Sequence, residues 1–281
     1  RQQMLRVYRA DIKTVDAFCT ALLRENSHLL GEDARGHALR PDFRVLDENE
    51  AQVLRERVLA RTLDDFYDCL TPGGTLLADT LGAGRDDSAL EDLVLELHAK
   101  LQAQPYEDKW LDAQRAFWRA VPDKIEDTPY GKILLNEVRR KARHCKNLLQ
   151  RAAQEMCAND ALNQKYAPAF LDASYQLEAL EGKTAEGWDA ARGVTIAFPR
   201  LAAVKDSDGG EMKARMKSLW DNCKETVKGF AEIFSASSDE AVEDLRTMAS
   251  AMLALIDLTA DFSRRYNEEK RRRNSADFSD Q

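Results

Sequence analysis

The chain has 281 residues, of which 44% are hydrophobic and 32% charged, and its formal net charge is -8 at pH 7. This length is enough for a globular core and lies at the upper limit for one domain. No apolar run approaches the roughly 18 residues of a membrane helix and no charged-then-apolar leader begins the chain, so we expect a cytoplasmic protein without a membrane partner. The acidic balance argues against a protein coated in nucleic acid, so any DNA contact is expected from a local basic patch.

Patterns of cysteine and histidine give no sign of a metal or cofactor site. The cysteines are odd in number, widely separated and mostly at apolar helical positions, which predicts buried free thiols: Cys19, Cys69, Cys145, Cys157 and Cys223. No Cys-x-x-Cys occurs, and the histidines show no ligand spacing. We therefore expect no metal and no cofactor in this chain.

The first half of the chain is predicted to be helical after a short strand. Residues 1–9 resemble a helix end, Ile12–Val15 a short strand, Ala17–Leu30 a helix and Gly31–Pro41 a loop. Asp47 and Glu50 have the spacing of a capping box. The helix that they start is expected to run to about Leu70 and to stop at Pro72-Gly-Gly74. Further helices are predicted at Leu76–Leu81, at Leu90–Leu101 after a turn at 82–87, and at Tyr106–Ala120.

The second half is predicted to contain longer helices. A helix over Tyr130–Ala158 carries an apolar stripe of Leu134, Val138, Ala142, Cys145, Leu149 and Ala152. An antiparallel partner at Asp160–Leu180 is interrupted by Pro168, and helices at Ala185–Phe198, Glu211–Phe234 and Ala241–Arg273 follow. We expect tryptophans 110, 118, 188 and 220 in the core. The fold class is all-α: an irregular bundle of long antiparallel helices, with a short strand remnant near the N-terminus.

Two segments carry a recognisable family pattern. One reads Ile12-x-Thr-Val-Asp-Ala-Phe-Cys-x-x-Leu-Leu-Arg-Glu25, then His28-Leu-Leu-Gly31, then Asp42-Phe-Arg-Val-Leu-Asp-Glu48. The other comprises Tyr266, Lys270 and Asn274-Ser-Ala-Asp-Phe-Ser-Asp280. Together they resemble AddA (RexA), the UvrD/RecB-like helicase–nuclease component of the AddAB complex. In that family the first segment follows motif Ia, and the second leads into the Walker B aspartates, which would lie beyond Gln281.

The resemblance implies a domain organisation. Residues 1–16 would be a fringe of motor domain 1A, residues 17–273 the helical 1B subdomain, and residues 274–281 a fringe leading back to 1A. On this interpretation the chain is an excised piece of an ATP-dependent DNA helicase and exonuclease, a hydrolase of double-strand break repair. The parent would use ATP and Mg, and its partners would be duplex DNA, single-stranded DNA and an AddB-type subunit. The piece itself is expected to be inactive, because Walker A, motif II and the nuclease motif lie outside it.

Two groups are candidates for DNA contact, and neither is without an alternative. Thr14, Asp16 and Phe18 are assigned to single-stranded DNA through the resemblance alone. A hydroxyl can bond a phosphate and an aromatic ring can stack on a base. Asp16 stands where many relatives have His, and its carboxylate would repel phosphate or accept a hydrogen bond. Phe18 could equally be a core residue.

The second group lies on one face of the helix predicted over Tyr130–Ala158. Lys132, Arg139, Arg143 and Lys146 share that face, with Arg140 beside them. Such a face could follow a duplex backbone. The alternative is a solvated face paired with acidic neighbours. The basic clusters at Lys213, Arg215 and Lys217 and at Lys270–Arg273 raise the same question, and the position of the latter at a helix end explains it structurally.

One further pattern, Gly182-Lys-Thr184, resembles the end of a phosphate-binding loop. The first glycine of that motif would fall at Leu177, and the preceding residues are typical of a helix, so we interpret it as a helix end and do not expect ATP binding. A rival to the DNA-binding hypothesis is a helical protein–protein interaction module. A small helical enzyme is disfavoured because no catalytic cluster is evident.

Overall fold

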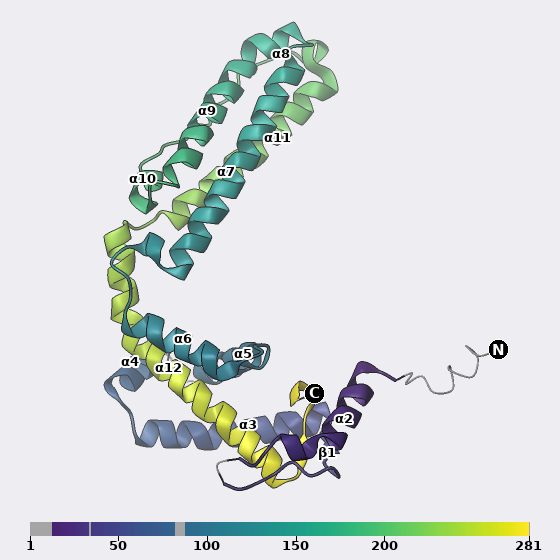
Figure 1. Ribbon diagram of the computed structural model, residues 1–281. Coiled ribbons are helices and arrows are strands. Elements are labelled where there is room, and N and C mark those ends of the chain that lie inside the picture. The colour runs from purple at the N-terminus through teal and green to yellow at the C-terminus, as the bar shows by residue number, and fades with distance from the viewer. Residues whose placement is uncertain (1–12, 34, 82–87, 281) are drawn as a thin grey trace, which may run out of the picture. The chain divides into compact units, whose positions relative to one another are not determined.

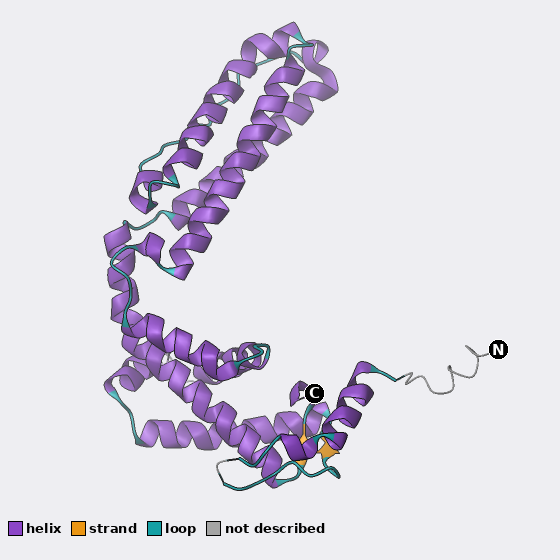
Figure 2. Ribbon diagram, viewed as in Figure 1, coloured by secondary structure: helices purple, strands orange, loops and turns teal. Residues whose placement is uncertain are grey.

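The computed structural model describes residues 13–33, 35–81 and 88–280, and for residues 206–209 it describes the backbone alone. The helix end predicted at 1–9 and the turn predicted at 82–87 lie outside these residues. Helices account for nearly all regular structure in the described ranges (Figure 2), and the strands there are two residues long. The all-α prediction is confirmed.

The chain divides into two compact units. Unit 1 contains residues 1–120 and 248–281, and unit 2 contains residues 121–247. The long helix α12 (Ser238–Arg272) contributes its first turns to unit 2 and the rest, from Met248, to unit 1.

Unit 1 packs its helices and the end of α12 around an apolar core. Leu54, Val94 and Phe262 are among the buried residues of this core, and they come from α3, α5 and α12. The predicted capping box is present at the start of α3, where Glu50 N donates to Asp47 Oδ1 (2.9 Å). Before α12 the elements of unit 1 are α2 (Val15–Glu25), η1 (Ser27–Leu29), β1 (Arg44–Val45), α3 (Glu48–Asp68), α4 (Pro72–Leu81), α5 (Ser88–Gln102) and α6 (Glu107–Arg119).

The two segments that carry the family pattern lie side by side in unit 1. Strand β1 pairs in parallel with β2 (Ser275–Ala276), with Arg44 opposite Ser275 and Val45 opposite Ala276. Asn274 makes the turn between α12 and β2 at φ 49°, a left-handed conformation that asparagine tolerates better than most residues. The 3-10 turn η3 (Phe278–Asp280) follows β2.

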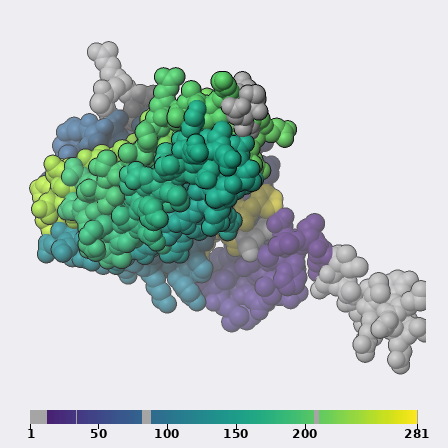
Figure 3. Space-filling model, turned by 90° about the horizontal axis from the view of Figure 1, so that it is seen from above, coloured from purple at the N-terminus to yellow at the C-terminus, as the bar shows by residue number. Residues whose placement is uncertain are grey.

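Unit 2 is a bundle in which α7 (Pro129–Met156), α9 (Ala167–Lys183) and α11 (Asp206–Ile233) share a core (Figure 1). The short elements η2 (Ile125–Asp127), α8 (Asp160–Lys165) and α10 (Trp188–Arg192) complete it. Phe170 stacks on Trp220 with ring centroids 4.8 Å apart, which joins α9 to α11. The atoms of this unit form a continuous packed surface in the space-filling view (Figure 3).

The structure corrects several predicted boundaries. The strand predicted at Ile12–Val15 is not formed where it is described, because Val15 begins α2, and the pair β1–β2 was missed. Pro72 opens α4 rather than only ending α3, since Thr71 Oγ1 accepts from Gly74 N (3.1 Å). The helix predicted over Ala185–Phe198 is limited to α10, because Gly193 and the β-branched residues 194–196 do not continue it.

The predicted core is correct in most positions. Leu135, rather than Leu134, is buried on α7, and the rest of the predicted stripe is buried as expected. Three of the tryptophans are buried, and Trp110 is half-buried. All five cysteines are free, as predicted, but only Cys145 and Cys223 are buried.

Candidate nucleic-acid interface

The predicted single-strand residues lie at the exposed start of α2. Thr14 caps the helix, its Oγ1 accepting a hydrogen bond from Ala17 N (3.2 Å). Asp16 lies in the first turn, where a carboxylate offsets the partial positive charge of the free N–H groups. Phe18 is 51% exposed, so the alternative of a core residue is not realised within this chain. The ring is free to contact another molecule or another segment.

The predicted basic face of α7 is largely engaged with α9. Arg139 donates from Nε to Thr184 Oγ1 (2.9 Å) and from Nη2 to the Thr184 carbonyl (3.0 Å), capping the end of α9. Glu181 accepts from Arg143 Nε (2.7 Å) and from Lys146 Nζ (2.8 Å). These hydrogen bonds, that from Lys146 foremost, hold the pKa of Glu181 below its ordinary value. Residue numbers along α9 fall as those along α7 rise, so the two helices are antiparallel, as predicted.

A second set of α7 cations faces solvent. Lys132 and Arg151 are exposed and form no ion pair with any described residue. Arg140 bonds to Glu137 of its own helix, at 2.9 Å, and its side chain is 73% exposed. Seven Lys and Arg and two Glu occupy α7, in a chain of net charge -8. The solvent face of α7, defined here by Lys132, Arg140 and Arg151, is therefore a local basic patch that no other described helix neutralises.

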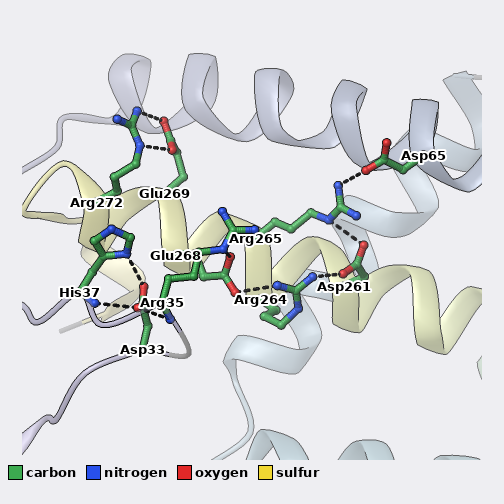
Figure 4. A network of polar contacts seen from close by, with 10 residues as sticks. All are labelled: Asp33, Arg35, His37, Asp65, Asp261, Arg264, Arg265, Glu268, Glu269 and Arg272. Atoms are coloured by element: carbon green, nitrogen blue, oxygen red, sulfur yellow. Dashed lines mark hydrogen bonds and ion pairs between the residues drawn. The ribbon is translucent and has the colours of Figure 1, made fainter.

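Arginines of unit 1 form a network with carboxylates (Figure 4). Glu268, which is buried, pairs with Arg35 Nε (3.0 Å) and with Arg264 Nη1 (2.6 Å). Arg272 pairs with Glu269 (2.7 Å), and with Arg273 it lowers the pKa of Glu269 to about 2. The Arg35–Glu268 pair attaches the loop before β1 to α12, so this network has a structural role.

The same loop is shaped by one carboxylate. Asp33 Oδ1 accepts from Arg35 N (2.9 Å) and His37 N (2.8 Å), and Asp33 Oδ2 lies 3.1 Å from His37 Nδ1. Burial raises the pKa of Asp33, but these hydrogen bonds outweigh it and hold the pKa below its usual value.

Two arginines that the sequence did not single out remain available in unit 1. Arg57 and Arg61 lie one turn apart on the exposed side of α3 and form no ion pair with any described residue. Arg57 borders a pocket of about 420 Å³ that Arg44 and Arg273 also line. An i, i+4 pair of this kind on an otherwise neutralised surface could have been found only by knowing which cations are paired.

The second family segment forms a buried polar cluster. Tyr266 OH donates to Asp277 Oδ2 (2.6 Å), and Lys270 Nζ lies 2.6 Å from Asp280 Oδ1 and 3.4 Å from Asp277 Oδ2. Burial, and then the hydrogen bond to Asp277, raise the pKa of Tyr266, whereas the Lys270 ammonium and hydrogen bonds outweigh burial and lower the pKa of Asp277. The motif therefore secures the segment after α12 rather than presenting a reactive group.

His98 of α5 lies against this cluster with no hydrogen-bond partner for either ring nitrogen among the described residues. Its ring meets Phe262 edge-on at 4.9 Å and Tyr266 at 5.8 Å. Burial, assisted by the Lys270 charge, lowers the pKa of His98 to about 4. The imidazole is neutral at pH 7 and serves as an aromatic packing group.

No phosphate-loop geometry surrounds Gly182-Lys-Thr184 in the described structure. Lys183 ends α9 and bonds Glu186 (2.7 Å), while Thr184 is buried under Arg139. The predicted helix end is confirmed. Among the described residues, no group of three or more His, Cys, Asp or Glu could hold a metal ion. No described helix is long and apolar enough to cross a membrane.

These features define first a class: a charge-rich helical region whose described residues form ion-pair networks and packing surfaces. The chain is similar to proteins named as the A-type subunit of an ATP-dependent helicase/nuclease. The protein of that name from Ruminiclostridium cellulolyticum is 28% identical over 290 aligned positions, covering 99% of this chain and 22% of that protein. Those from Desulforudis audaxviator and Acetivibrio thermocellus are 31% and 26% identical, covering 97% and 100% of this chain and 22% of each protein. No family model matches the chain.

The resemblance to AddA is thus confirmed along almost the whole chain. The chain spans about a fifth of the length of the curated relatives it matches.

Proposed function

We propose that this chain is the DNA-contacting 1B subdomain, with motor-domain fringes at 1–16 and 274–281, of an AddA-type ATP-dependent helicase and exonuclease of double-strand break repair. The observation that carries the proposal is the similarity of 97–100% of the chain to relatives of that name. In the proposed parent, ATP and Mg bind outside this segment, an AddB-type subunit is the partner, and the location is the cytoplasm.

The solvent face of α7 is the proposed duplex contact. Its three cations lack partners on neighbouring described helices, so they can neutralise phosphates without breaking the α7–α9 seam. Arg139, Arg143 and Lys146 contribute indirectly, because their bonds to Thr184 and Glu181 fix α7 against α9. The exposed start of α2, with Thr14, Asp16 and Phe18, is the proposed single-strand contact.

A salt titration tests the duplex contact. Binding of a fluorescent duplex of about 20 base pairs is measured by anisotropy between about 50 and 200 mM salt for the wild type and for the triple variant Lys132→Glu, Arg140→Glu, Arg151→Glu. Three phosphate contacts correspond to a slope of about -2.7 in log K against log salt, or about 40-fold in affinity over this range. The triple variant is expected to lose that dependence.

The matched control is the triple variant Lys100→Glu, Arg119→Glu, Lys217→Glu, which lowers the net charge equally at exposed positions away from α7. It is expected to retain most of the wild-type binding. Equal losses in both variants, or no duplex binding by the wild type at the lowest salt, would contradict the proposal.

The rival function is a helical protein–protein interaction module. The internal pairing of Arg139, Arg143 and Lys146 favours it, because those cations serve the bundle itself. On this alternative the duplex does not bind in a manner that depends on the solvent face of α7, and the same titration distinguishes the two.

A further inference from the structure

Unit 2 contains a groove beside α11 that the proposed DNA contact does not use. Its volume is about 540 Å³, within the range of ligand pockets. One wall is α11, at Lys224, Val227 and Lys228, and the other is the segment that follows α10, drawn as a loop in Figure 2. We call it the α11 groove.

The floor of the α11 groove is apolar and well supported. Phe230 and Leu180 are buried, and Val194, Ile196 and Phe198 are half-buried against the core of the bundle. Phe198 meets Trp220 edge-on with centroids 4.7 Å apart. A floor fixed by such contacts offers a preformed surface for an apolar side chain, at little cost in ordering.

The rim of the α11 groove is cationic. Arg192, Lys224 and Lys228 line it, and its lining includes no carboxylate among the described residues, although the chain as a whole carries a net charge of -8. Lys228 is 75% exposed and lies 3.8 Å from the Glu225 carboxylate, so that pair contributes little. Lys224 forms no ion pair with any described residue. The rim therefore selects anionic groups on either side of an apolar one.

The wall after α10 can accept an extended chain. Burial alternates from Val194 to Phe198, which is the period of an extended segment. Ala197 N is bonded to Gln176 Oε1 (2.6 Å), whereas the N–H groups of Ile196 and Phe198 have no hydrogen-bond partner among the described residues. Free main-chain donors beside an apolar floor are the requirement for adding a peptide strand.

We infer that the α11 groove binds an acidic, extended peptide segment of a partner protein, with an apolar side chain on the floor and flanking carboxylates at Arg192, Lys224 and Lys228. Nucleic acid fits less well, because the aromatic rings there are packed against the core and leave no exposed face for base stacking. This site is separate from the solvent face of α7, and its primary test uses no DNA, so either proposal can fail alone.

The probe is a blocked, fluorescent octapeptide of alternating Asp and Leu, measured by anisotropy against the full chain. Saturable binding in the micromolar range is expected. Two comparison peptides, with Ser replacing Leu or Lys replacing Asp, are expected to bind at least tenfold more weakly. Equal binding of the Asp–Ser peptide would overturn the proposal, because it would reduce the contact to charge alone.

Variants locate the site. Lys224→Glu with Lys228→Glu is expected to weaken the Asp–Leu peptide at least tenfold, and Ala231→Trp, at an exposed position in the lining, is expected to block it without disturbing the core. The control is Lys132→Glu with Lys217→Glu, which changes the charge equally outside the groove. Unchanged binding in both groove variants would refute the assignment, as would a labelled oligonucleotide that binds the wild type and loses its binding in the groove variants alone.

Discussion

Lys270 is predicted to be worth far more to stability than Arg272, two residues along the same helix. The Lys270 side chain is 3% exposed and its ammonium lies between Asp277 and Asp280, whereas Arg272 is 57% exposed and pairs with Glu269. Lys270→Met keeps the apolar stem but leaves the buried Asp277 carboxylate without its cation. Removing one partner of a buried ion pair costs about 3–5 kcal/mol, and an exposed pair is worth about 0–1 kcal/mol.

The assay is urea unfolding followed by fluorescence of Trp110 and Trp118, which lie in unit 1. We expect the free energy of unfolding to fall by about 3–5 kcal/mol in Lys270→Met and by no more than about 1 kcal/mol in Arg272→Met. Adding Asp277→Asn to Lys270→Met is expected to restore part of the loss, because the uncompensated charge is removed. Equal losses in the two single variants, or no recovery in the double variant, would refute the reasoning.

Two further predictions concern pH and backbone packing. Because the pKa of His98 falls from 6.5 to about 4 on folding, the unfolded chain binds the extra proton; stability is therefore lost as pH falls from about 6.5 to 4, by about 3 kcal/mol. His98→Leu should flatten that part of the pH profile in urea unfolding, whereas His28→Leu, at an exposed position, should leave it unchanged. Gly131→Ala should destabilise unit 2 by more than about 2 kcal/mol, because the new Cβ would lie 1.9 Å from the Ile125 carbonyl oxygen. Gly229→Ala, where a Cβ meets nothing within 4 Å, should stabilise α11 by up to about 1 kcal/mol in the same thermal or urea measurement.

Local signals predicted the helices well because they depend on neighbouring residues. The capping box at Asp47 and Glu50, the break at Pro168 and the apolar stripe of α7 are properties of short windows, and each is present. The failures occurred where a local signal was ambiguous. Pro72 can end one helix or open the next, and the segment after Gly193 contains residues that suit a helix but follow a glycine and a β-branched run.

The candidate site was less accessible to prediction. Spacing placed Arg139, Arg143 and Lys146 on one face, and that is correct, but whether a cation on that face meets solvent or Glu181 depends on the position of α9. Arg57, Arg61 and the α11 groove could not be selected either, because a free cation differs from a paired one only in what lies across from it.

By itself, the sequence determined the helical class, the main helix boundaries and the likeness to AddA-type helicase/nucleases, since periodicity, caps and motifs are all written in consecutive residues. Only the tertiary structure decided that the Phe43–Glu48 and Asn274–Asp280 segments pair as parallel strands, and that Tyr266 and Lys270 fasten the second of them. The reason is physical: parallel pairing of segments about 230 positions apart, with one at Arg44 and the other at Ser275, leaves no local trace in either of them.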